Sequence, residues 1–188
     1  PSPKLKAIGG VPQQMSCGIG FRKALGQQSA ITMTSRWKCI VPFGFGGMEH
    51  QTITTMNRYL ETDERVVVHE LAHQWWGDVV TCKDWRHLWL NESFATYFDP
   101  LYFEYRYGRD EFETRLRENQ LNAIRTDRSL GRKPIVSVGS FGNNVYSRGA
   151  TVLHMLRNLL GDRLFWKSIN LYITRHQFSP VETNDLKR

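Results

Sequence analysis

The chain has 188 residues, of which 40% are hydrophobic and 12% aromatic. That is enough for one domain with a sizeable core. No stretch approaches the roughly 20 consecutive apolar residues that a membrane-spanning helix needs. The formal net charge is +7. Because the basic residues are scattered and form no dense block with stacking aromatic residues, the composition argues against a nucleic-acid partner.

Three cysteines, Cys17, Cys39 and Cys82, occur in the chain. Their odd number and the lack of a C-x-x-C pair argue against a disulfide framework and against a cysteine zinc site. We therefore interpret them as buried apolar thiols. No secretory signal pattern is visible, and the sequence leaves the cellular compartment open.

Residues 1–37 mix Gly, Gln, Ser and basic residues without a clear period. We expect irregular structure or one weak helix in this N-terminal segment, and we place no motif there. Residues 38–45, KCIVPFGF, predict a short strand that ends at a turn. The β-branched residues of 52–56, TITTM, predict a second strand.

The remainder of the chain is predicted to be mainly helical. A buried helix is expected between Asp63, a suitable N-cap, and Gly77, which can end it. Residues 126–144, rich in Gly and Asn, predict a loop. Further helices are predicted over 91–107, from Asp110 with Glu113 completing a capping box, over 145–160, and from about 162 to before Pro180.

The last residues, VETNDLKR, are typical of the opening of another helix, with Thr183 as its cap. A chain seldom evolves to stop at such a point. We therefore expect residues 1–188 to be a piece of a longer protein.

The motif H-E-L-A-H at 69–73 lies in the first predicted helix. Residues i and i+4 of an α-helix are about 40° apart around its axis, so His69 and His73 can offer both imidazoles to one metal ion. Glu70 is offset toward the same side, where it can reach a metal-bound water. This spacing is typical of a zinc site with a general base. Plain core histidines are the alternative, but buried imidazoles and a carboxylate are costly without partners.

A catalytic zinc ion needs a third protein ligand, and Glu92 is the candidate. Eighteen residues separate it from His73, and it lies in WLNESFATYF on the next predicted helix. Two helices joined by a short excursion can bring this carboxylate to the metal. Two His and one Glu leave the fourth position for water, which is the arrangement of a catalytic zinc site.

Together, H-E-L-A-H, the spacing and the Glu of N-E-S-F-A resemble the gluzincin aminopeptidases related to aminopeptidase N. Residues 46–50, GGMEH, are similar to that family's G-x-M-E-N exopeptidase motif, and residues 145–150, VYSRGA, to the segment that holds its catalytic tyrosine. The resemblance covers 38–188. It implies a thermolysin-like α+β catalytic domain, with a small mixed β-sheet beside a mainly helical lobe and one zinc ion at their junction.

The resemblance also implies what the motif residues do. Glu70 would act as the general base and later protonate the leaving amine. Tyr146 would hydrogen-bond the oxyanion of the tetrahedral intermediate. The reaction would release the N-terminal residue of a peptide by means of zinc-activated water.

The segment before the helix would bind the substrate. Glu49 would hold the free α-amine of a peptide, because a fixed anion selects a cationic N-terminus. Gly46, Gly47 and Met48 would bring the backbone close to the peptide and add strand-like hydrogen bonds. Family members also carry an N-terminal β domain and a C-terminal helical domain, and neither fits in 188 residues.

Two other functions stay open. One is a zinc hydrolase with a non-peptide substrate, as in the related leukotriene hydrolase. The other is an inactive metal-bound module for binding or scaffolding, which the presence of Glu70 and Tyr146 disfavours. His50 replaces the usual Asn of the exopeptidase motif, and we interpret it as a tolerated substitution. Asp78 either orients a ligand imidazole or has a capping or loop role.

Overall fold

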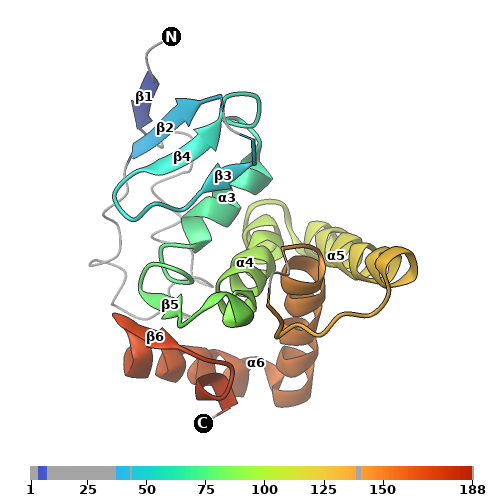
Figure 1. Cartoon of the computed structure of the whole chain (residues 1–188). Helices are drawn as coiled ribbons and strands as arrows, with labels where there is room; N and C mark the ends of the chain where they lie inside the picture. Colours follow the sequence, from blue (N-terminus) through green and yellow to red (C-terminus); the bar gives the residue numbers. More distant parts are fainter. Residues whose placement is uncertain (1–3, 8–36, 43, 139–140, 188) are drawn as a thin grey trace.

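The computed structural model describes residues 4–7, 37–42, 44–138 and 141–187. Figure 1 shows a small β-sheet at the end of the molecule that holds the N-terminus, with helices making up most of the rest. Mixed α+β architecture, as predicted, is thus confirmed. Within the described ranges, no helix is both long and apolar enough to cross a bilayer.

The main sheet is mixed and has the strand order β1-β2-β4-β3. Strand β4 pairs parallel to β2 and antiparallel to β3, while β1 pairs antiparallel to β2. Both predicted strands are present, although each is shorter than or displaced from its predicted range. The sequence pattern does not predict β3, because two residues are too few to show alternation. The strands are β1 (Lys4–Ala7), β2 (Trp37–Val41), β3 (Gly47–Met48) and β4 (Thr54–Asn57).

Helix α3 (Glu64–Ala72) carries the H-E-L-A-H motif and packs against β3 and the next helix. Asp63 caps it as predicted, since its side chain accepts hydrogen bonds from the backbone of Arg65 and Val66. The helix ends with His73 as its C-cap, before the predicted end at Gly77. The chain tightens there into short-range turns, and Gly77 then adopts φ 143°.

Three long helices follow, and the two glycines at 108 and 161 interrupt them as the sequence indicates. Helix α5 begins at Arg109, so Asp110 is not its cap, and it extends to Leu130, which corrects the predicted start of the loop at 126. An ion pair between Asp127 and Arg148 holds this extra turn in place. The helices are α4 (Trp89–Tyr107), α5 (Arg109–Leu130) and α6 (Gly149–His176), the last with a break at Gly161.

A second, two-stranded parallel sheet joins the segment after α3 to the segment after α6. Its strands are β5 (Val80–Cys82) and β6 (Ser179–Val181), and short 3-10 helices lie nearby at Trp85–His87 and Asp185–Lys187. Thr183 does not cap a terminal helix as predicted. Its hydroxyl accepts a hydrogen bond from Trp89 Nε1 at 2.9 Å and lies 2.9 Å from His87 Nδ1. These contacts hold the segment around Thr183 beside the start of α4.

The largest core lies between α4, α6 and the segment after α3. Trp76 stacks on Phe94 with ring centroids 4.1 Å apart, and Tyr172 stacks on the same pair. All three rings are buried. Since interiors pack at crystal-like density, this core gives the start of α4 and the end of α3 a rigid support.

The cysteines differ from their predicted environment. Cys39 and Cys82 are free thiols, and both are half-buried rather than fully buried. Cys17 lies outside the described residues.

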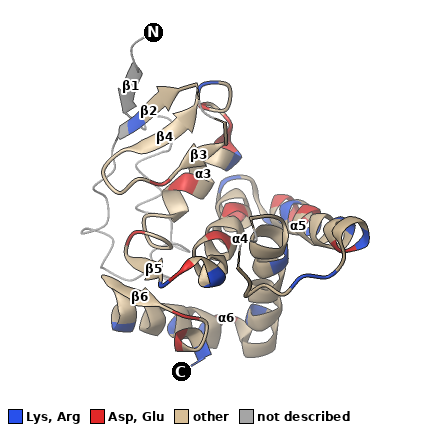
Figure 2. Ribbon diagram, viewed as in Figure 1, with Lys and Arg blue, Asp and Glu red and all other residues tan. Residues whose placement is uncertain are grey.

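Charged residues are spread over several elements, as Figure 2 shows. On α5 many of them form ion pairs along the helix, for example Arg109 with Glu113 and Arg115 with Glu111. Such pairs at i and i+4 support an exposed helix face. Arg109 and Arg115 of this helix therefore have acidic partners on or next to it.

Candidate active site

His69, His73 and Glu92 meet where the end of α3 faces the start of α4. The Nε2 atoms of the two histidines are 3.1 Å apart. Oε2 of Glu92 lies 3.2 Å from the His69 nitrogen and 3.3 Å from the His73 nitrogen. Donors that each bind a tetrahedral zinc ion at about 2.1 Å lie about 3.4 Å apart. The three side chains therefore fit a zinc ion in their present positions.

The orientation of His73 is set by the turn that follows it. Its Nδ1 atom lies 2.7 Å from the carbonyl oxygen of Trp76. A carbonyl oxygen can only accept, so Nδ1 carries a proton, and in the neutral imidazole Nε2 then has the lone pair that can bind a metal ion. Asp78, a candidate for this role from the sequence, instead accepts a hydrogen bond from Gln74 Nε2 at 3.1 Å. Asp78 thus belongs to the loop and does not hold the imidazole.

Glu70 lies beside this triangle and is only 6% exposed. Its Oε2 atom is buried and has no hydrogen-bond partner within the described part of the chain. Burial raises the pKa of Glu70 to about 8, and the charges of Glu49 and Glu92 act in the same direction. An unpartnered buried carboxylate is costly. A hydrogen bond between this oxygen of Glu70 and a water or a ligand at the metal would offset that cost.

The electrostatics of the cluster favour a cation. Burial lowers the pKa of His69. Burial opposes protonation of His73 too, but the hydrogen bond that His73 donates to Glu92 and the charges of Glu92, Glu49 and Glu70 outweigh it and raise the pKa of His73 to about 10. Three carboxylates around two imidazoles thus stabilise positive charge, which a divalent metal ion would supply.

Glu49 reaches the site from the edge of the sheet. Strand β3 pairs with β4 in the register Gly47 to Met56, and Glu49 follows the strand directly. Its Oε1 atom lies 3.7 Å from His73 Nδ1. Glu49, Glu70 and His73 each offer a ligand atom within 4.8 Å of the others. The glutamate of the G-G-M-E segment is therefore next to the predicted metal ligands.

The neighbours of Glu49 take different positions. Gly46 lies against Val66 of α3, since an added Cβ would be 3.3 Å from that side chain. Met48 is exposed. His50 is exposed as well and its Nδ1 lies 3.0 Å from the hydroxyl of Thr55, so it contacts the sheet rather than the histidine cluster.

Tyr146 lies on a π-helical turn, η4 (Asn144–Arg148), which leads into α6. The wide turn is marked by the hydrogen bond from the Arg148 amide to the Asn143 carbonyl at 2.8 Å. Such turns occur often at functional sites. The Tyr146 ring stacks on His69 with centroids 6.0 Å apart. Burial and the nearby carboxylate of Glu92 raise the pKa of Tyr146, so its phenol stays protonated and can donate.

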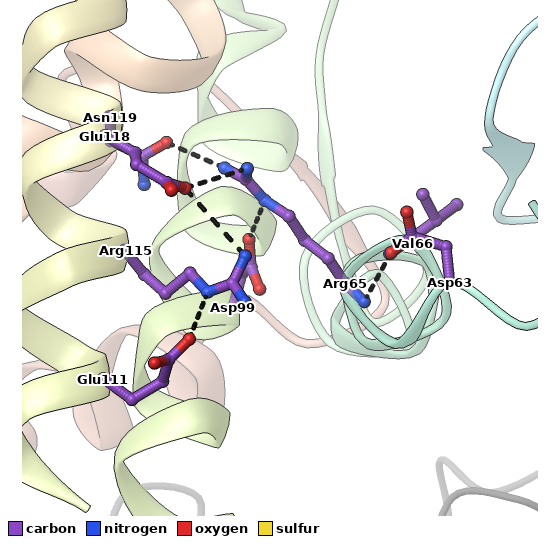
Figure 3. Close-up of polar contacts among 8 residues, drawn as sticks. All are labelled: Asp63, Arg65, Val66, Asp99, Glu111, Arg115, Glu118 and Asn119. Carbon is purple, nitrogen blue, oxygen red and sulfur yellow. Dashed lines mark hydrogen bonds and ion pairs between the residues drawn. The ribbon is translucent and has the colours of Figure 1, made fainter. Parts of the chain in front are cut away.

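A polar network joins helix α3 to the neighbouring helices, and Figure 3 shows Arg65 at its centre. Arg65 Nε donates to Asp99 Oδ2 at 2.6 Å, and Arg65 Nη2 donates to Asn119 Oδ1 at 3.2 Å. Arg65 precedes His69 by one helical turn, and Asp99 follows Glu92 by two turns. The network therefore joins α3, α4 and α5 on the side of α3 and α4 that also carries the three donor residues.

The structure thus gathers the sequence-predicted residues around one point. The Trp76 carbonyl was outside any sequence-based prediction, because a backbone oxygen has no signature in the residue pattern. Arg65 and Asp99 could be suspected only from their helical spacing to His69 and Glu92. The residues brought together are Gly47, Glu49, His69, Glu70, His73, Glu92 and Tyr146.

Comparison with known proteins identifies one family for most of the chain. The model of the Peptidase family M1 domain matches residues 34–188. Aminopeptidase M1 of Arabidopsis thaliana is 35% identical over an alignment of 171 residues, with 78% of this chain and 19% of that protein covered. Probable aminopeptidase 2 of Sulfurisphaera tokodaii is 36% identical, with 78% and 21% covered. The chain spans about a fifth of the length of these relatives.

Solved structures share the fold. The M1 zinc metallopeptidase of Deinococcus radiodurans superimposes with a TM-score of 0.68 at 34% identity, covering 79% of this chain and 33% of that one. Leukotriene A4 hydrolase of Saccharomyces cerevisiae gives a TM-score of 0.70 at 23% identity, covering 77% and 26%. The second likeness concerns the fold alone. Both confirm the predicted catalytic-domain architecture.

Proposed function

Because the chain belongs to peptidase family M1, we propose that it is the catalytic core of a zinc aminopeptidase. His69, His73 and Glu92 are the proposed ligands of one zinc ion. When bound, zinc would activate a water molecule and polarise the carbonyl of the scissile bond. The spacing of the three metal-donor atoms supports this assignment, and so does the hydrogen bond that His73 Nδ1 donates to the Trp76 carbonyl.

The observation that carries the proposal is the state of Glu70. Its carboxylate is buried beside the three donors, and one of its oxygens has no partner among the described residues. Glu70 would take a proton from the attacking water and pass it to the leaving amine. A carboxylate whose pKa burial has raised is suited to both halves of that transfer.

Tyr146 would stabilise the negative charge that develops on the carbonyl oxygen. Its ring lies over His69, and its phenol remains protonated. A donor held in a fixed place before the reaction costs no reorganisation during it.

Glu49 and β3 would bind the substrate. Within the described residues β3 pairs only with β4, so its other edge can accept an extended peptide. Glu49, at the end of this edge, would form an ion pair with the peptide's α-ammonium group. That contact would place the first peptide bond, and not a later one, at the metal.

Turnover of paired substrates tests the proposal. The zinc-loaded chain should hydrolyse aminoacyl-4-nitroanilides, and a chelator such as 1,10-phenanthroline should stop the reaction. The N-acetylated counterparts should be poor substrates, because they lack the cationic amine. Zinc binding without turnover of any member of the panel would instead favour the inactive module. Equal turnover of the acetylated substrates would contradict the aminopeptidase assignment.

A further inference from the structure

Ser93 connects the helix that carries Glu92 to the turn that carries Tyr146. It follows Glu92 directly on α4 and is fully buried. Its hydroxyl donates to the backbone carbonyl of Val145 at 2.5 Å. Val145 in turn precedes Tyr146 directly. One side-chain hydrogen bond therefore spans the neighbours of a proposed metal ligand and of the proposed oxyanion donor.

The two elements meet very closely at this point. A Cβ atom added to Gly149 would lie 1.7 Å from the Ser93 hydroxyl and 2.5 Å from its Cβ. No side chain fits there, and glycine lets the start of α6 rest directly on α4. The serine hydroxyl thus lies in a closed contact between the helices, where no water separates it from the Val145 carbonyl.

The turn needs such support because its geometry is unusual. It is π-helical, with the Arg148 amide bonded to the Asn143 carbonyl five residues earlier. A π turn is rare and persists where tertiary contacts hold it. Thr151 adds a local bond from its hydroxyl to the Ser147 carbonyl at 2.8 Å, but this bond stays within the same stretch of chain. The Ser93 bond instead sets the turn against α4.

We propose that Ser93 is a positioning residue, which holds the Tyr146 turn in register with Glu92 and His69 so that the phenol faces the reacting carbonyl. The inference rests on the proposed function, because Tyr146 matters for turnover only if the site hydrolyses peptides. Ser93 itself touches neither substrate nor metal. Its removal should leave the metal ligands in place and release the tyrosine.

Fluorine NMR tests the position of Tyr146 without relying on activity. The chain would be labelled with 3-fluorotyrosine at its 7 tyrosines, and the Tyr146 signal identified by its absence from Tyr146→Phe. In Ser93→Ala that signal should shift or broaden, because the ring leaves its stacked place over His69. The same experiment on the Co²⁺-loaded chain should show a reduced paramagnetic shift of this signal. Ser93→Gly should repeat both results.

Ser179→Ala is the matched control. Ser179 also donates from its hydroxyl to a backbone carbonyl, that of His176, at 2.7 Å, but it lies at the other end of α6. This variant should leave the Tyr146 signal unchanged. A Tyr146 signal that is the same in Ser93→Ala as in Ser179→Ala would overturn the inference.

A kinetic cycle separates this inference from the proposed function. With Tyr146 present, Ser93→Ala should lower kcat about tenfold with little change in KM, a fraction of the loss that follows removal of an oxyanion donor. In the Tyr146→Phe background the same substitution should have no further effect. Equal effects in both backgrounds would overturn the positioning role. Normal kcat in Tyr146→Phe would instead contradict the proposed role of the tyrosine.

Discussion

A Cβ atom added to Gly47 would lie 2.6 Å from Cδ of Glu70. The backbone of the edge strand β3 therefore rests directly on the carboxylate that we propose as the general base. Gly47 is needed here for close approach, since no larger residue leaves the carboxylate where it is. A shift of β3 at this contact would therefore move the Glu70 side chain.

Gly47→Ala should displace Glu70 and lower kcat by about 10²-fold, the cost of moving a catalytic group by about 1 Å. Zinc content should be unchanged, because Gly47 is not one of the three proposed zinc ligands. Gly44→Ala is the control, since an added Cβ there meets nothing within 4 Å. Measuring kcat and zinc content of both variants checks this. Equal activity of the two variants would show that the contact does not constrain the base.

Glu70→Gln keeps the shape of the side chain and removes its ability to accept a proton. We expect kcat to fall by about 10²- to 10⁴-fold, the usual contribution of a general base. Zinc content, measured by mass spectrometry of the metal, should stay at the wild-type level. Normal turnover in this variant would rule out Glu70 as the base.

Glu49→Ala should weaken binding of substrates with a free amine. A hydrogen bond to a charged group contributes about 1.5–3 kcal/mol, so kcat/KM for aminoacyl-anilides should fall about 10- to 100-fold. The small residual activity on N-acetylated substrates should change little. Glu113→Ala, which removes an exposed carboxylate on α5, serves as the control. A loss of zinc in Glu49→Ala would instead indicate that this glutamate supports the metal.

Asp99 should make stability depend on pH. It is 2% exposed, and its burial raises its pKa to about 6 despite the ion pair with Arg65. Between about pH 4 and pH 6 the folded protein therefore holds a proton on Asp99 that the unfolded chain has released. The free energy of unfolding falls as the pH rises through this range. The loss is on the order of 3 kcal/mol.

Urea unfolding of wild-type and Asp99→Asn at pH 4.5 and pH 7 measures this effect. The free energy of unfolding should fall more between these pH values in the wild type than in Asp99→Asn, which cannot titrate. Arg65 remains in both proteins, so the difference belongs to the carboxyl group (Figure 3). Identical pH dependence in the two proteins would contradict the buried state of Asp99.

Gly149→Ala should destabilise the fold, because its Cβ would collide with Ser93. Overpacking of this kind costs about 1–3 kcal/mol. Adding Ser93→Gly removes the colliding atoms and leaves the Ser93 Cα 3.7 Å away, an ordinary contact. The double variant should then be more stable than Gly149→Ala alone, although a glycine inside α4 costs about 1 kcal/mol. Thermal unfolding measures the stability of both variants. Stability changes that simply add would contradict the close contact between Gly149 and Ser93.

The residues on one helix were the easiest part of this site to predict. His69, Glu70 and His73 share a face because of helical periodicity alone, and Asp63 caps that helix through a local hydrogen bond. Glu92, Glu49 and Tyr146 come from other elements. Glu92 was a candidate because a catalytic zinc ion needs a third protein ligand. The roles of Glu49 and Tyr146 needed the resemblance to a known family, because residue spacing does not determine how separate elements pack.

The parts that could not be predicted depend on the backbone or on distant contacts. The hydrogen bond from His73 to the Trp76 carbonyl involves no distinctive side chain. The early end of α3 follows from that same turn. Thr183 has the features of a helix cap, yet its hydroxyl is bound by Trp89, more than ninety residues away in sequence. Tertiary contacts outweigh local propensity at such positions.

Zinc stoichiometry tests the central claim most directly. The purified chain, given zinc and then dialysed, should retain about one ion per molecule, as expected for a site with two His and one Glu. His73→Ala should lose that ion, whereas His154→Ala should keep it, because His154 contacts Tyr97 and Phe112 and lies outside the donor cluster. A folded wild-type chain that retains no zinc, or a His73→Ala variant that retains as much as the wild type, would contradict the ligand assignment.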